Sequence, residues 1–127
     1  MSFGFNGGRG LIVVVADIRG PSATTSVMLA LDTGATGTVL NDAVVAAAGY
    51  KPAATSELVE ITTGSGVESA PLIRLQAVSC LGRKKRNFPV LCHTLPPSAG
   101  VDGLLELDFF RGTTLTIDFG KGRLKIR

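Results

Sequence analysis

The segment that decides the fold is Ala30-Leu31-Asp32-Thr33-Gly34-Ala35, which continues to residue 40 as Thr36-Gly37-Thr38-Val39-Leu40. An apolar strand ends here in a carboxylate, a hydroxyl side chain and a glycine. A carboxylate at the end of a buried strand meets a low dielectric and converging backbone groups, which favours acid–base chemistry. The glycine lets a second backbone approach closely. The triplet 32–34 taken alone also fits a simple strand-ending turn, in which Asp32 accepts backbone N–H groups.

Outside this segment the chain reads as strands and tight turns. A β-branched, apolar stretch at 11–18 and a strand at 24–31 flank a turn at 19–22. One helix is expected at 43–48, ended by Gly49, and a second at 104–110. Further strands are expected at 58–62, 67–81, 87–92, 113–118 and 123–126. This pattern predicts an all-β fold, a small closed β-barrel with two short helices.

Composition limits the class of protein. The chain has 127 residues, enough for one domain, and its formal net charge is +3. The run Arg83-Lys84-Lys85-Arg86 is interpreted as a solvated hairpin turn, and a nucleic-acid site there is the weaker alternative, because no aromatic residue adjoins it for base stacking. The apolar run 11–16 is too short for a secretion signal or a membrane span, so we expect a cytoplasmic protein without a membrane partner.

The cysteines, Cys80 and Cys92, permit one disulfide, but buried free thiols are the favoured interpretation. Together with His93 they give too few ligands for a structural zinc site, so neither a metal nor another cofactor is expected. A serine or cysteine hydrolase would have to use His93, the only histidine, and this alternative is not favoured.

Residues 30–40 resemble the active-site segment of the retropepsin-like aspartic proteases, in particular of bacterial single-lobed members. The stretch Val101-Asp102-Gly103-Leu104-Leu105, followed by Leu107-Asp108-Phe109-Phe110, resembles the second signature of that family. The glycine-rich turn at 63–66 falls where the family has its flap. The resemblance covers about residues 11–127 and leaves residues 1–10 as a flexible N-terminal arm.

The resemblance implies roles for individual residues. Asp32 would be the catalytic aspartate, Thr33 would make hydroxyl contacts across two subunits, and Gly34 would leave room for the substrate backbone. The remaining substrate-site residues implied by the resemblance are Ala35, the flap residues Thr63, Gly64, Ser65 and Gly66, and Gly103 behind the active-site loop.

The chain departs from the family pattern at three positions. Thr36 and Leu104 stand where many retroviral members have an Asp–Arg pair, and both partners are replaced together, so no lone buried charge remains. Glu106 stands where many members have a second glycine. The sequence alone therefore does not decide the local backbone path at this position or whether the site is active.

One Asp-Thr-Gly motif per chain implies a homodimer, because this chemistry needs two carboxylates that share one proton. The expected function is an aspartic endopeptidase acting on a protein or peptide substrate, with one Asp32 from each chain. The alternative is a catalytically silent homodimeric peptide-binding module of the same fold.

Overall fold

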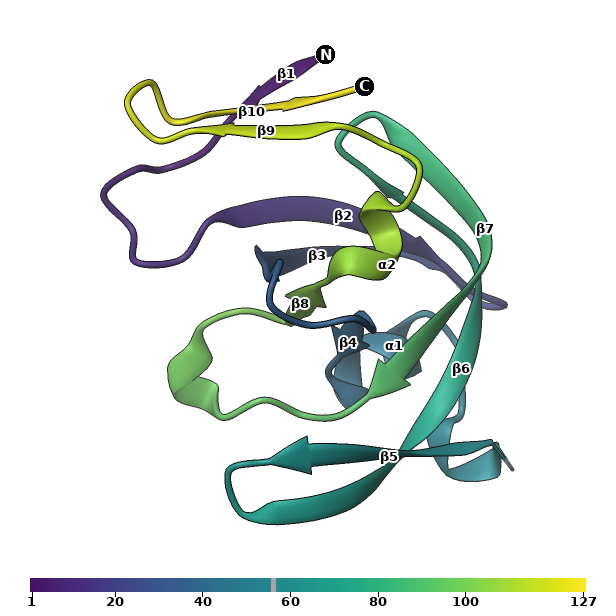
Figure 1. Cartoon of the computed structure of the whole chain (residues 1–127). Helices are drawn as coiled ribbons and strands as arrows, with labels where there is room; N and C mark the ends of the chain where they lie inside the picture. The colour runs from purple at the N-terminus through teal and green to yellow at the C-terminus, as the bar shows by residue number, and fades with distance from the viewer. Residues whose placement is uncertain (56) are drawn as a thin grey trace.

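The computed structural model of the chain describes residues 1–55 and 57–127, apart from the side chain of Thr63 (Figure 1). The elements are β1 (Ser2–Gly4), β2 (Val13–Arg19), β3 (Thr24–Leu31), β4 (Val39–Leu40), α1 (Asp42–Ala47), η1 (Pro52–Ala54), β5 (Leu58–Thr63), β6 (Gly66–Cys80), β7 (Arg83–Cys92), η2 (Pro97–Ala99), β8 (Gly103–Leu105), α2 (Leu107–Phe110), β9 (Leu115–Asp118) and β10 (Arg123–Ile126).

Six strands close into a barrel, which confirms the predicted fold class. Their order is β2-β3-β8-β4-β7-β6, and β2 also pairs with β6 to close the ring. Strand β8 lies parallel to β3 and antiparallel to β4. Strand β5 pairs with β6, and the two form a hairpin that projects beyond the barrel at the bottom of Figure 1. We call residues 58–71 of this pair the flap hairpin.

The core follows from the alternation of buried and exposed side chains along the strands. In β2, Val14, Ala16 and Ile18 are buried while the residues between them are exposed, as expected of a strand with one face on a core. Phe109 of α2 is fully buried and makes edge-to-face contacts with Phe88 and Phe110. Helix α2 therefore packs into the core of the barrel, behind the segment that carries Asp32.

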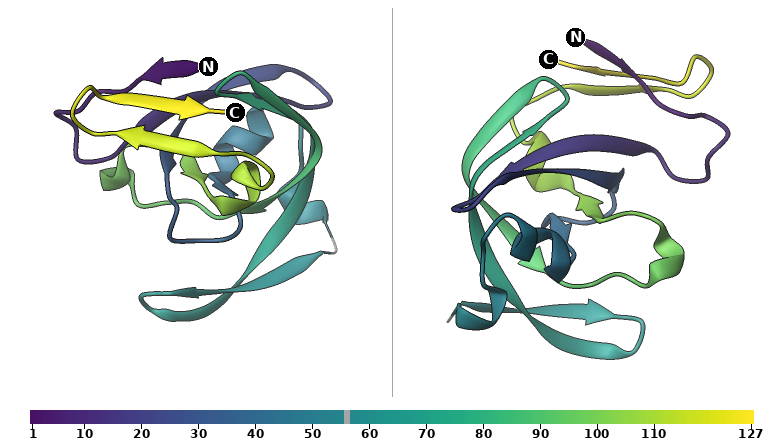
Figure 2. Two further views of the ribbon diagram at one scale, coloured as in Figure 1. Left: turned by 45° about the horizontal axis from the view of Figure 1, so that its top comes forward. Right: turned by 180° about the vertical axis from the view of Figure 1, so that it is seen from behind.

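The N-terminal residues are not a loose arm throughout, because Ser2–Gly4 forms strand β1 and pairs with β10. Phe3 and Phe5 pack against the core, whereas the glycine-rich composition of residues 1–10 had suggested a flexible segment. Figure 2 shows β1, β9 and β10 as a small sheet across one end of the barrel, with both termini in it.

The second helix is shorter than predicted. Residues 103–105 form β8, and the helix begins at Leu107. Pairing of Ala30 with Leu104 and of Leu31 with Leu105 satisfies backbone groups that a helix starting at residue 104 would leave unpaired against β3.

The prediction that the basic run Arg83–Arg86 forms a hairpin turn is also wrong. The hairpin turn is Leu81-Gly82, with φ of 52° and 70°, and Arg83–Arg86 are the first residues of β7. Positive φ at both central residues is the requirement of a two-residue hairpin turn.

Both cysteines are buried and free, as the sequence predicts. Burial raises the pKa of Cys80 to about 12 and that of Cys92 to about 11. In the described part of the chain, no helix is long and apolar enough to cross a membrane.

Candidate active site

Asp32 is the first residue after β3, and the strand pairing fixes its position. Its backbone N–H donates to the carbonyl oxygen of Leu105 in β8 at 2.9 Å. Its carboxylate oxygen Oδ1 accepts the N–H of Gly34 at 2.9 Å. A Cβ at Gly34 would lie 3.3 Å from that same oxygen, a tight approach. The turn 32–34 therefore holds the Asp32 carboxylate partly exposed, and a glycine fits best beside it.

Hydrogen bonds to residues at the start of α2 hold the loop that follows Asp32, residues 33–38. The carboxylate of Asp108 accepts the backbone N–H of Thr38 at 3.0 Å and the Thr38 hydroxyl at 2.6 Å. The same hydroxyl oxygen accepts the N–H of Glu106 at 3.1 Å. Leu107 donates its N–H to the carbonyl oxygen of Ala35 at 3.1 Å. Thr38 is only 2% exposed, so its side of these bonds is shielded from water, and the bonds fix the position of the loop.

Glu106 is a buried carboxyl in the same region, at 4% exposure. Its Oε1 accepts the N–H of Gly37 at 3.0 Å. Burial, with a smaller contribution from the negative charges of Asp32 and Asp108, raises the pKa of Glu106 from 4.5 to about 7, and the Gly37 N–H opposes this rise. The position where the family often has glycine thus holds a carboxyl that is neutral in mildly acidic solution.

Gly103 lies in β8 behind the active-site loop. A Cβ there would stand 2.2 Å from the backbone oxygen of Val39 and 3.0 Å from a methyl group of Leu40. Only glycine allows β4 and β8 to come this close. Among the described residues, Leu104 rather than Gly103 lines the groove, so a substrate contact by Gly103 stays a prediction.

A groove of about 720 Å³ runs between the Asp32 loop and the flap hairpin. Asp32, Gly34 and Ala35 lie along it, and so does Glu106. Apolar side chains make up most of the remaining lining. They are Val39, Val59, Ile61, Leu72, Pro89, Leu91, Leu95 and Leu104. The lining also includes the titratable side chains Glu60, His93 and Asp108. Such an apolar lining with a few polar groups is typical of a substrate cleft.

The predicted flap residues are a turn between β5 and β6, as expected, but the groove is lined by the strand before it. Residues 59–62 of β5 line the groove, and Gly64, Ser65 and Gly66 do not. The side chain of Thr63 lies outside what the structure describes. Thr33 is exposed at the start of the loop and does not line the groove of a single chain.

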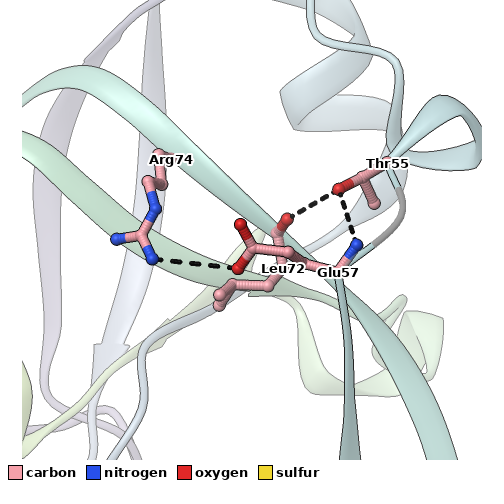
Figure 3. Close-up of polar contacts among 4 residues, drawn as sticks. All are labelled: Thr55, Glu57, Leu72 and Arg74. Atoms are coloured by element: carbon pink, nitrogen blue, oxygen red, sulfur yellow. Dashed lines mark hydrogen bonds and ion pairs between the residues drawn. The ribbon is translucent and has the colours of Figure 1, made fainter.

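The base of the flap hairpin is tied to the barrel by polar contacts (Figure 3). The Thr55 hydroxyl donates to the carbonyl oxygen of Leu72 at 3.2 Å and accepts the N–H of Glu57 at 3.3 Å. Glu57 also pairs with Arg74 at 3.8 Å. Both charged side chains are about half exposed, so this ion pair contributes little stability. These contacts fix the point at which the flap hairpin leaves the barrel. That point lies beside the groove, because Leu72 lines it.

Sequence reasoning missed the hydrogen-bonded set behind the loop, which comprises Thr38, Glu106 and Asp108. It also missed that His93 lies in the groove and pairs with Glu68 of the flap hairpin, with Nδ1 and Oε2 3.8 Å apart. The sequence contains a signal for this hydrogen-bonded set. Thr38 lies near the end of the active-site segment 30–40, Asp108 belongs to the second family signature, and the fold brings the two together.

Comparisons with known proteins agree with this fold and indicate a family. The sequence model of one protein family, described as aspartyl protease, matches residues 14–109. The structure is similar to the crystal structure of a retropepsin-like aspartic protease from Rickettsia conorii, with a TM-score of 0.74 and 18% sequence identity. That alignment covers 98% of this chain and 86% of the other. No curated protein sequence is significantly similar to the chain.

Proposed function

Because the chain belongs to the aspartyl protease family, we propose that it is an aspartic endopeptidase whose active site is built by two copies of the chain, each contributing Asp32. The observation that carries this proposal is the Asp32 carboxylate, which lies in the turn 32–34 beside a mostly apolar groove. A groove between the Asp32 loop and the flap hairpin suits an extended peptide segment.

The chemistry requires two carboxylates that share one proton. The ionised one takes a proton from a water molecule, and that water attacks the peptide carbonyl carbon. The protonated one donates its proton to the carbonyl oxygen. The Gly34 N–H supports this role by orienting Asp32 through Oδ1, and the bonds from Thr38 to Asp108 support it by fixing the loop.

The proposed substrate is a peptide segment with bulky apolar residues on either side of the cleaved bond. The lining by Val39, Ile61, Leu91 and Leu104 supports this preference, because burial of an apolar side chain is favourable by about 25 cal/mol per Å². Thr33, exposed at the mouth of the loop, is proposed to contact its copy in the second chain.

The test is hydrolysis of a denatured protein by the wild type and by Asp32→Asn over a range of acidic pH. We expect Asp32→Asn to keep the fold and to lose hydrolysis by at least about a thousandfold. The matched control is Asp17→Asn, an exposed aspartate of β2 outside the groove, which should keep wild-type activity. A wild type that binds peptides but never cleaves them would instead support the catalytically silent peptide-binding module.

A further inference from the structure

A second hollow, of about 560 Å³, lies at the opposite end of the barrel from the flap hairpin. It is formed by the β6–β7 turn with the first residues of β7, and by the segment that follows α2, both in the upper right of Figure 1. Its lining residues are Gly82, Arg83, Lys84, Lys85, Arg86, Arg111, Gly112 and Thr113. None of them lines the groove of the candidate active site.

The hollow collects positive charge without a matching acid. Five of its lining side chains are basic and none is acidic. Among the described residues, none of these five belongs to an ion pair. Asp17 lines an adjoining hollow with Arg83 and Lys84, and its single negative charge there leaves an excess of positive charge around the five basic side chains. Like charges gathered around one cavity repel each other, so a bound anion would stabilise this arrangement.

Two of the basic side chains are partly buried rather than fully exposed to water. The Nε of Arg83 is buried and has no hydrogen-bond partner within the described part of the chain. Lys85 donates from Nζ to the carbonyl oxygen of Arg111 at 3.5 Å, and the same atom lies 5.7 Å from the centre of the Phe109 ring. An unpaired buried donor is costly. An oxyanion beside the Arg83 guanidinium would pair it through two parallel hydrogen bonds.

The lining also restricts the kind of anion. The residues that form the hollow include no aromatic side chain, and Phe109 beneath it is fully buried, so nucleic-acid bases have no ring on which to stack. The lining offers no large apolar side chain for insertion into a membrane either. Several fixed charges around a small hollow match a compact anion that carries several negative oxygens.

We propose that this hollow binds a compact, multiply charged anion of the phosphate type, such as an oligophosphate. Arg83 and Arg111 supply forked donors from the two sides, and Lys84, Lys85 and Arg86 supply further positive charge. The proposal does not depend on peptidase activity, because the hollow and the groove share no residue.

The test is calorimetric titration of the whole chain with tripolyphosphate at about 0.15 M salt, where general charge attraction is screened beyond about 8 Å. We expect saturable binding that Arg83→Gln/Arg111→Gln weakens by at least about tenfold. The matched control is Lys121→Gln/Lys125→Gln, which removes two exposed charges elsewhere and should leave the affinity within about twofold. If Arg83→Gln does not fold, Lys84→Gln/Arg86→Gln takes its place in the same titration, because it changes only exposed side chains of β7.

Three results would overturn the proposal. One is no saturable binding of tripolyphosphate. Another is equal weakening by the control pair, which would indicate general charge attraction. The third is tighter binding of a single-stranded oligonucleotide than of tripolyphosphate at the same salt, which would assign the surface to nucleic acid.

Discussion

Replacement of Glu106 by glutamine should make the protein more stable at neutral pH but not at acidic pH. Glutamine has nearly the same shape, and its side-chain oxygen accepts the Gly37 N–H as Oε1 of Glu106 does. It removes a carboxyl that is 4% exposed and lies near two other carboxylates, Asp32 and Asp108.

The size of the effect follows from proton linkage. The pKa of Glu106 rises from 4.5 to about 7 on folding, so the folded chain retains a proton between these values while the unfolded chain has lost it. The contribution of this group to the unfolding free energy is therefore complete below pH 4.5 and is lost as the pH rises through about 7. A shift of about 2.5 pH units at about 1.4 kcal/mol each amounts to about 3 kcal/mol.

The assay is urea unfolding followed by circular dichroism at pH 4.5 and pH 8, with wild type and Glu106→Gln at the same chain concentration. The stability difference between variant and wild type should grow by about 3 kcal/mol in favour of the variant between the two pH values. Glu60→Gln, at an exposed position, should show a change within about 0.5 kcal/mol. A difference for Glu106→Gln that stays constant with pH, or that favours the wild type at pH 8, would refute the reasoning.

Three further predictions concern stability and reactivity. Thr38→Val should destabilise the fold by roughly 2 to 4 kcal/mol, because it removes a buried donor and acceptor; Thr116→Val, at an exposed strand position, should change stability by less than about 0.5 kcal/mol in the same urea titration. Gly103→Ala should cost about 2 kcal/mol or more, since the new Cβ would lie 2.2 Å from a backbone oxygen, and a melting temperature equal to that of wild type would contradict this. Cys80, with a pKa of about 12, should resist a thiol reagent at pH 8 in the folded chain and react after unfolding in urea; rapid labelling of the native thiol would show that it is not buried.

The sequence predicted the barrel because apolar, β-branched stretches such as residues 11–18, bounded by turn residues, are a local signal that the fold preserves. It predicted the turn at Asp32 for the same reason, since the turn chemistry lies within neighbouring residues. The strand β8 was missed because its three residues are defined by parallel pairing with β3, about 74 residues earlier, and no local pattern distinguishes it from a helix.

The buried position of Glu106 depends on contacts that no local pattern specifies. The bond from Gly37 spans 69 residues along the chain. A lone glutamate between apolar residues is compatible with either a solvent-facing or a buried position, and only the packing of α2 behind the loop decides between them. Strand β1 was missed because two phenylalanines with a core contact lie within a glycine-rich segment whose composition suggests flexibility.

The most direct test of the central claim is the specific activity of wild-type chains mixed with increasing amounts of inactive Asp32→Asn chains. The mixtures are unfolded and refolded together so that the chains pair at random, and their size is measured in the same samples. If each active site needs one Asp32 from each of two chains, an equal mixture should retain about half of the activity per wild-type chain, because half of the wild-type chains then pair with an inactive partner. Activity that stays proportional to the amount of wild-type chain alone would contradict the account, and it would leave a carboxyl of the same chain, with Glu106 the first candidate, as the second acid of the site.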